Sequence, residues 1–511
     1  MLFIFVFIFC ISSLGVQAQE IIQEKDSVSI YKDINDFSRR SKFSRFVYKL
    51  LFRESALKVE NLIPVPTKKH ENGVGEHQEG KIIRNITIET LDPFGFSVSN
   101  VQKKPKRKLE NFGNAVHIKT KEITIRNIML FKKYDKLDSK LLQESERLIR
   151  SQRYVREVDI VAVDIPNSVD SVDVTIRALD SWTLIPTGSL SSNESSVKIT
   201  ERNILGFGHL ISGNIKNRFN TNESAVYGQY SINNIKNTYI KLDLDYANEY
   251  NNDSRRSINI NRPFYSVIAK NAGGVFFENR MQTEQFPVDD LLNPQVISYD
   301  LQEYWYGRAF KINSKSNPNR YFNNLVLALT YNQKNFGRQP DVVLDPSLYF
   351  SKEKNWVGMI GFSKQKFYQD TFLFNFEIEE DIPYGENIAL IIGHQEKNST
   401  SRMYSGISVS YGKKFKMGYF SGVAEWGSFY NSGSTEQTTF KLGLNYFSPL
   451  LHVGSWRFRQ FIKPTFICGN NRDTSFKDRL NLLESDGLPG FNSRLNGVQK
   501  WSVSFQTQSY I

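Results

Sequence analysis

Residues 240–246 read Ile-Lys-Leu-Asp-Leu-Asp-Tyr, with an apolar side chain at every second position and a charged one between. Successive side chains of a strand point to opposite faces, so this pattern predicts a β-strand with one apolar and one hydrated face. The same alternation recurs after Trp182, between clusters of Asn, Asp, Ser and Gly, and three further examples are residues 325–332, 372–379 and 440–446. The sequence therefore predicts a mainly β chain from residue 182 to residue 511.

A soluble β-sandwich and a membrane-spanning barrel both give alternating strands. Two features of the segments favour the barrel. They approach the roughly 9 to 11 residues that a tilted strand needs to cross a bilayer, and several end in Tyr or Phe, where an interfacial aromatic girdle would lie. We expect a transmembrane antiparallel β-barrel over residues 182–511.

The N-terminus has the features of an export signal. Residues 1–18 contain a short apolar run that ends in Val16-Gln17-Ala18, a pattern suited to signal peptidase. Beyond it no window of about eighteen uncharged apolar residues follows, which excludes a helical membrane bundle. The chain has two cysteines, Cys10 and Cys468, and removal of the signal peptide would leave one, so we expect no internal disulfide and no cysteine-based zinc site.

Between the signal and the barrel the composition changes twice. Residues 19–80 show no sheet pattern and are expected to be a helical or loosely ordered lead-in. Residues 81–181 predict a small α+β domain with strands at 82–88, 122–130, 155–163 and 172–179. Asp138 is placed to cap a helix that continues to Ser151, with Leu137, Leu141, Leu148 and Ile149 as its apolar stripe.

Three segments, in chain order, carry a resemblance to a known family. Residues 137–159 and 170–182 resemble the end of a POTRA (polypeptide-transport-associated) domain, and residues 201–209, ERNILGFGH, are similar to the hairpin that opens barrels of the BamA and TamA type. Residues 486–491, DGLPGF, resemble the family's loop that folds into the barrel lumen. The resemblance implies a barrel of the surface-antigen type in the Gram-negative outer membrane, with a POTRA-like periplasmic domain at residues 81–181.

The resemblance also implies functional positions. The first barrel hairpin would contain Asn203, Gly206 and Gly208, and the lumen loop would contain Gly487, Pro489, Gly490, Phe491, Arg494 and Gly497. The family has Arg where this chain has Pro489, and Glu where it has Gln506 on the lumen face of the following strand. Loss of one partner would leave a confined charge unpaired, whereas loss of both costs less. We hypothesise a concerted neutralisation, with Arg494 as the nearby cation able to substitute.

The end of the sequence departs from the family. One strand, residues 501–511, follows the lumen loop, and about a dozen strand-like segments are recognisable where the resemblance implies sixteen. We therefore expect the barrel to be C-terminally incomplete. The partner of its first strand, residues 183–190, is expected to lie beyond the sequence.

The resemblance implies a chain that assists insertion, assembly or translocation of β-rich proteins at the outer membrane without covalent chemistry. An edge strand at residues 155–163 would bind unfolded outer-membrane or secreted clients by β-augmentation, through Val155, Val158, Ile160 and Val163. Arg147, Arg150, Arg153 and Arg156 recur at every third position and predict either a solvated face or contact with lipid head groups or the barrel rim. Outer-membrane lipid and periplasmic or lipoprotein accessory factors are further expected partners.

Two other functions stay open: a two-partner secretion pore for one dedicated substrate, and a passive channel. Enzyme signatures are not found. The six histidines are scattered, and the sequence has no His-Glu-x-x-His, Gly-x-Ser-x-Gly or phosphate-loop motif. We expect no catalytic residues, no metal site and no cofactor. The net charge of +12 is spread along the chain, and in an exported protein it does not indicate a nucleic-acid partner.

Overall fold

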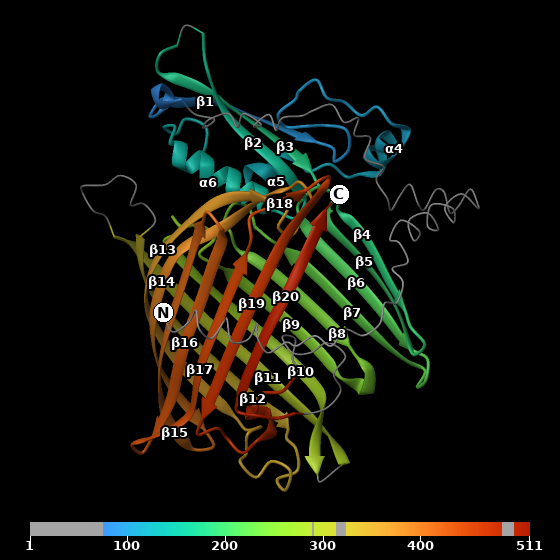
Figure 1. The fold of residues 1–511 in the computed structure, drawn as a ribbon, viewed down its shortest axis with the longest axis vertical. Helices are drawn as coiled ribbons and strands as arrows, with labels where there is room; N and C mark the ends of the chain where they lie inside the picture. The colour runs from blue at the N-terminus through green and yellow to red at the C-terminus, as the bar shows by residue number, and fades with distance from the viewer. Residues whose placement is uncertain (1–74, 167, 289–290, 313–322, 483–494, 511) are drawn as a thin grey trace, which may run out of the picture. The chain divides into compact units, whose positions relative to one another are not determined.

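The computed structural model describes residues 75–166, 168–288, 291–312, 323–482 and 495–510. All of them belong to one compact unit, Asn72–Ile511. The signal peptide and nearly all of the expected lead-in lie outside the described residues. Figure 1 shows two sheets in this unit, a small one near its N-terminal end and a large one built from the rest of the chain.

The small domain has three strands and three α-helices. Its strands are β1 (Ile82–Leu91), β2 (Val155–Asp164) and β3 (Ser171–Asp180), and its helices are α4 (Lys108–Val116), α5 (Glu122–Arg126) and α6 (Ser139–Arg150). The sheet order is β1-β3-β2, with β3 parallel to β1 and antiparallel to β2. The expected strands at 82–88, 155–163 and 172–179 are confirmed as β1, β2 and β3, the expected helix is α6, and β2 is an edge strand as predicted.

The core of the small domain lies between this sheet and helices α5 and α6. It contains Ile83, Ile86, Ile125, Leu142, Leu148, Ile149, Val174 and Ile176 among others. Asp138 caps α6 as expected, because its Oδ1 accepts hydrogen bonds from the backbone N–H groups of Lys140 and Leu141.

The expected strand at residues 122–130 is wrong. This segment forms α5 and a following turn, and its buried residues include Thr124, Ile125, Ile128 and Met129. Buried positions four apart lie on one side of a helix, and this helical spacing outweighs the β-branched composition of the segment.

The large sheet is a closed barrel of seventeen strands among the described residues. They are β4 (Leu184–Leu190), β5 (Glu194–Ile204), β6 (His209–Arg218), β7 (Glu223–Ile232), β8 (Lys241–Asn248), β9 (Ser254–Arg262), β10 (Asn271–Val288), β11 (Leu291–Lys311), β12 (Asn323–Arg338), β13 (Glu353–Thr371), β14 (Glu379–Lys397), β15 (Thr400–Phe415), β16 (Gly418–Asn431), β17 (Ser434–Phe447), β18 (Leu451–Val453), β19 (Trp456–Asn470) and β20 (Gln499–Tyr510). Because β18 has three residues and β17 also pairs directly with β19, sixteen long strands form the wall.

Two expectations about the barrel are corrected here. The described strands exceed the dozen recognised in the sequence, because several have an irregular alternation that hides them. The neighbour of β4 is β20, which lies inside the sequence and closes the sheet. The expectation that the partner of β4 lies beyond the sequence is therefore wrong.

The two faces of the wall follow the predicted alternation. On β8, Asp243 and Ala247 are buried, whereas Leu244 and Tyr246 are exposed. Leu327 and Leu329 on β12 and Phe440 on β17 are likewise exposed apolar side chains. The outer surface of these strands is thus apolar, and the polar residues point inward, where Ser231 on β7 donates a 2.7 Å hydrogen bond to Asp243.

Candidate functional site at the barrel seam and its inner turn

The seam is the place where the first and last barrel strands meet. β4 pairs with β5 over residues 184–190, and β20 pairs with β19 over residues 499–510. Although β4 and β20 are neighbours, no continuous residue register joins them among the described residues. Among the described residues, the contact between β4 and β20 is therefore smaller than the contacts between the other long neighbouring strands.

The first strand at the seam is short, and the last strand has an apolar outer surface. β4 has 7 residues, whereas β11 on the opposite part of the sheet has 21. Pro186 in β4 has no N–H to donate, so this strand lacks one backbone donor. On β20, Trp501, Val503 and Phe505 are exposed. The seam is thus short, weakly paired and apolar on its outer surface.

The turn between β13 and β14, which are far from the seam in strand order, contacts the seam strand β20 and its neighbour β19. Residues 372–378, here called the inner turn, connect β13 and β14, and Phe372 and Glu377 have positive φ values of 58° and 56°. The sequence predicts a strand here, and that prediction is wrong. Two residues in the left-handed region end the extended conformation, and the side chains of Phe372 and Leu373 are buried.

The inner turn packs against β14, which follows it, and against three strands farther along the chain. Leu373 is 1% exposed and lies in a cluster with Ile382, Tyr419, Phe447 and Phe461, which come from β14, β16, β17 and β19. The Phe374 ring lies 6.3 Å from the Phe461 ring. The turn therefore covers the inward face of the wall between β14 and β19.

Residues of β20 and of its neighbour β19 also contact the inner turn. The ring of Phe372 lies 5.2 Å from that of Tyr510 on β20, and the ring of Phe376 lies 6.0 Å from it. The Tyr510 hydroxyl donates to Gln508 Oε1 at 2.8 Å and lies 3.5 Å from the Leu373 carbonyl. The Arg457 guanidinium on β19 lies 4.8 Å above the Phe372 ring. The end of the seam strand β20 is thus tied to the turn.

An ion pair between the buried Arg459 guanidinium and the partly exposed Asp370 fixes the start of the turn. Arg459 on β19 is 1% exposed, and its Nη2 donates to Asp370 Oδ1 at 3.1 Å and to the Thr371 carbonyl at 2.8 Å. Its Nη1 donates to the Ser448 carbonyl at 3.2 Å. A buried charge is costly unless it is paired and hydrogen-bonded, so these partners hold the turn at one position.

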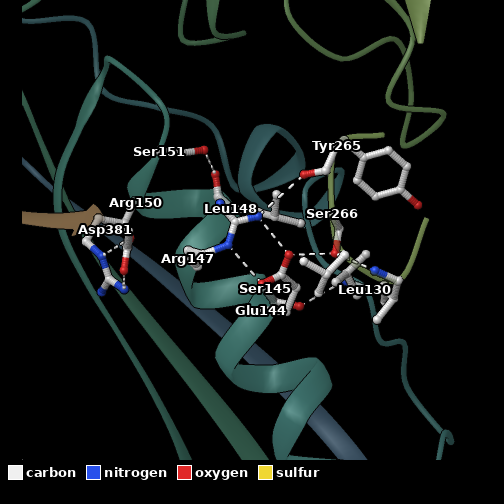
Figure 2. A network of polar contacts seen from close by, with 12 residues as sticks. Leu130, Glu144, Ser145, Arg147, Leu148, Arg150, Ser151, Tyr265, Ser266 and Asp381 are labelled. Carbon is white, nitrogen blue, oxygen red and sulfur yellow. Dashed lines mark hydrogen bonds and ion pairs between the residues drawn. The ribbon is translucent and has the colours of Figure 1, made fainter. Parts of the chain in front are cut away.

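The small domain contacts the barrel through α6, as Figure 2 shows. Arg150 donates two hydrogen bonds to Asp381 at the start of β14, at 2.9 and 3.1 Å. Burial alone would lower the pKa of Arg150, but Asp381 and Glu146 raise it. Burial raises the pKa of the adjacent Glu146 carboxyl. The guanidinium is therefore a charged link between the domain and the strand that follows the inner turn.

Two further residues of α6 reach the loop between β9 and β10. Glu144 accepts a 2.5 Å hydrogen bond from the Ser266 hydroxyl, and Arg147 donates to the Tyr265 carbonyl at 3.4 Å. The Arg147 guanidinium also lies 4.2 Å above the Phe367 ring on β13. Of the four arginines predicted as one face, Arg147 and Arg150 contact the barrel, and Arg156 lies 3.6 Å from Glu157 within the small domain. Arg153 follows α6 and lies near Arg202 on β5.

The predicted hairpin residues form a second contact between domain and barrel. Asn203, Gly206 and Gly208 lie at the turn between β5 and β6, one strand later than the expected first hairpin. Asn203 is fully buried; its side chain donates to Thr120 Oγ1 at 2.8 Å and accepts from the Gly208 N–H at 2.7 Å. The Gly206 carbonyl accepts from Thr124 Oγ1 at 2.7 Å. Both glycines have positive φ, and a Cβ at Gly208 would collide with the Tyr154 ring.

The remaining predicted residues are placed as follows. On β2, Val155, Val158 and Ile160 are buried in the domain core, and Val163 is exposed. Their side chains are therefore largely occupied by the core, and only the backbone of this edge strand could meet a client. Gln506 on β20 pairs with Phe461 and so shares its inward face. Gly497 exchanges two backbone hydrogen bonds with Leu480. Gly487, Pro489, Gly490, Phe491 and Arg494 lie outside the described residues, and so the neutralisation hypothesis stays a prediction.

Sequence reasoning missed the inner turn and its holders, Asp370, Arg457, Arg459 and Tyr510. Arg457 and Arg459 alternate with Phe458 as in any strand with a hydrated face, so nothing marks one of them as buried. A usable signal is the density of aromatics in residues 372–376, Phe-Leu-Phe-Asn-Phe, which exceeds what one lipid-facing strand needs.

Among the helices of the described residues, none has the length and apolar character to cross a membrane. The same residues contain no group of three or more His, Cys, Asp or Glu placed to hold a metal ion.

Comparison with known proteins gives structural neighbours only. No family model matches the sequence, and no curated protein matches it. Similar solved structures include CdiB from Acinetobacter baumannii (11% identity, 96% of this chain and 100% of that chain, TM-score 0.34) and CdiB from Escherichia coli (8%, 96% and 100%, 0.37). A third is BamA from Haemophilus ducreyi lacking POTRA domains 1–3 (11%, 83% and 85%, 0.28). Identity and TM-score are low in each case, so what this chain does is inferred below from its own residues.

Proposed function

We propose that this chain is an outer-membrane barrel that assists the insertion, assembly or translocation of β-rich client proteins without covalent chemistry. Its N-terminal export signal and the apolar outer surface of its strands support the location, because a closed barrel satisfies its backbone groups within the bilayer. The small α+β domain would then be periplasmic.

The observation that carries the proposal is the seam between β4 and β20. Backbone N–H and C=O groups left without a ladder can pair with a strand of another chain, and this mode of binding needs no particular client sequence. The short β4 also lowers the number of hydrogen bonds that would break on opening. A client strand would enter beside β4 or β20, while the free edge of β2 would receive clients in the periplasm.

The inner turn would control the opening. Tyr510, at the end of β20, is held by the turn, and the turn is held by Arg459 on β19. Movement of β20 away from β4 would therefore have to take the turn with it or break these contacts. Because Asp381, three residues after the turn, binds Arg150 of α6, a client on the small domain could influence the same element.

The proposal is tested by depleting the full-length gene product and quantifying integral outer-membrane proteins and secreted proteins in the same cells. A broad fall in barrel proteins, restored by the wild-type chain, is the expected result. Loss of one secreted protein alone would instead support the secretion-pore alternative. No change in either class would contradict both and leave the passive channel.

A further inference from the structure

Helix α4 presents an apolar face that nothing in the described chain covers. Leu109, Phe112 and Val116 are 53%, 65% and 54% exposed, and α4 has no buried residue. Residues spaced by three, four and seven lie on one side of a helix, so the three side chains form a continuous stripe. Ile118 just after the helix is also exposed.

The orientation of α4 is fixed from its opposite side. The Asn114 side chain accepts from the Phe94 N–H at 3.1 Å and donates to the Phe94 carbonyl at 2.9 Å. A Cβ at Gly113 would come within 2.8 Å of the Phe94 ring. Asn114 lies on the side of the helix opposite the Leu109, Phe112 and Val116 stripe, and Gly113, beside Leu109, permits close contact with the loop after β1.

Basic residues precede and follow this stripe in the chain, and of these Lys119 pairs with Asp92 and Lys121 lies over the Phe207 ring. Residues 101–121 contain seven Lys or Arg and one acidic residue, Glu110. The basic residues are Lys103, Lys104, Lys106, Arg107, Lys108, Lys119 and Lys121, all exposed. Glu110 is engaged locally, because its carboxylate accepts from the backbone N–H groups of Lys106 and Arg107. An amphipathic helix with an apolar stripe and clustered cations fits an anionic lipid interface.

The helix is also tied to the first barrel strand. The Phe94 ring lies 5.7 Å from the ring of Trp182, and the His117 ring, directly after α4, lies 6.4 Å from it. Trp182 stands two residues before β4, and its Nε1 donates to the Leu184 carbonyl at 2.6 Å. His117 Nε2 lies 3.0 Å from Asp180 Oδ2 at the end of β3. A rigid chain of contacts thus joins α4 to the point where the chain enters the barrel.

We propose that α4 lies in the bilayer interface on the periplasmic side, with Leu109, Phe112 and Val116 inserted among anionic phospholipids and the Lys/Arg cluster on their head groups. The inference rests on the proposed membrane location but not on the client function. It gives the small domain a second attachment, next to the seam, so that the membrane and the barrel together fix its position. Two other occupants of the stripe compete with lipid: the chain's own residues 1–74 and a second copy of the chain.

The test uses the full chain with Cys10 and Cys468 replaced by serine, and an environment-sensitive fluorophore on Phe112→Cys. The protein is reconstituted in nanodiscs of phosphatidylcholine with or without about a third phosphatidylglycerol. Spin-labelled lipid provides the quencher. The matched control carries the fluorophore on Val169→Cys, which is 82% exposed and lies between β2 and β3 of the same domain.

We expect at least a several-fold greater quenching at position 112 than at position 169 in anionic discs. Replacing Lys103, Lys104, Lys106 and Lys108 with glutamine, or adding salt, should reduce it toward the control value. Equal quenching at the two positions in anionic discs would overturn the inference. So would a fluorophore at 112 that is shielded from water in anionic discs but is not quenched by spin-labelled lipid, because that result places protein over the stripe.

A separate readout distinguishes failure of the inference from failure of the proposed location. Folded membrane barrels change their electrophoretic mobility on heating, and this shift is measured on the same nanodisc samples. A heat-modifiable barrel without quenching at 112 overturns only the α4 inference. A chain that does not enter the discs at all contradicts the membrane location on which it rests.

Discussion

The Arg459 guanidinium and the Asp370 carboxylate lie 3.1 Å apart, although their strands, β19 and β13, are separated in the sheet by β14 to β18. The contact exists because the inner turn brings residues from one side of the barrel to the inward face of the other. It joins β19, the neighbour of the seam strand β20, to the start of the inner turn. The small domain binds β14, just after the same turn, through Arg150.

This ion pair should couple the two residues energetically. Removing one partner of a buried pair typically costs about 3–5 kcal/mol, whereas replacing both with apolar residues costs much less. We expect Asp370→Leu and Arg459→Met each to lower the free energy of unfolding, and the double variant to be more stable than the sum of the two losses predicts. Urea unfolding in lipid vesicles gives the double-mutant cycle.

The control for this cycle is the exposed pair between Lys364 and Glu386, at 2.9 Å, with side chains that are each 46% exposed. Its coupling should be below about 1 kcal/mol. Similar coupling energies for the buried and the exposed pair would show that Arg459 does not hold the turn.

Leu373→Ala should release the inner turn. Truncation of a buried leucine costs about 2–5 kcal/mol, and here the loss falls on the contacts that hold the turn against β16, β17 and β19. We expect larger or more frequent openings in single-channel recordings. Leu329→Ala on the outer face of β12, where the side chain is 62% exposed, is the matched control and should leave conductance unchanged. Identical recordings for the two variants would argue against a restraining turn.

Gly206→Ala should impair assembly of the β5–β6 turn with the small domain. Its φ is +77°, and an added Cβ would collide with the Lys119 carbonyl. Left-handed strain of about 1–3 kcal/mol is expected in addition to that collision. The heat-modifiable fraction of newly made protein measures the effect. Gly213→Ala on β6 has no heavy atom within 4 Å of the new Cβ and should assemble normally; an equal defect in both would refute the assigned role of Gly206.

Lowering the pH should reduce the free energy of unfolding of the small domain, because it protonates Asp164. Hydrogen bonds from Lys81 and His77 hold the pKa of this carboxyl well below its usual range. Its stabilising effect is therefore present above the unfolded pKa of about 3.9 and is lost as the pH falls below it. Asp164→Asn should flatten the acid side of a stability curve followed by tryptophan fluorescence. An unchanged slope would mean that the contact contributes nothing to folding.

Sequence patterns predict what depends on local periodicity. The alternation at β8 and the cap at Asp138 are set by neighbouring residues, and both are confirmed. Residues 372–378 alternate equally well, but their apolar side chains pack against strands far along the chain, and the positive φ values of Phe372 and Glu377 have no signature in that alternation. Departures from local rules of this kind are expected at functional elements.

The seam and its neighbours depend on closure, which no local pattern contains. β4 finds β20 only because the other strands curve the sheet through a full circle. The hairpin residues Asn203, Gly206 and Gly208 were recognisable from the resemblance. Their partners Thr120, Thr124 and Tyr154 come from the small domain and could not be assigned before the domain was placed.

The most direct test of the account is site-specific photo-cross-linking in cells from positions beside the seam. A benzophenone amino acid replaces Leu190 on β4 or Phe505 on β20, which are 80% and 74% exposed, and Ile392 on β14, which is 63% exposed within continuous ladders, serves as the control. We predict adducts with several newly synthesised barrel proteins from the two seam positions and none from position 392. Adducts at equal yield from all three positions, or none from the seam, would contradict the proposal that clients enter between β4 and β20.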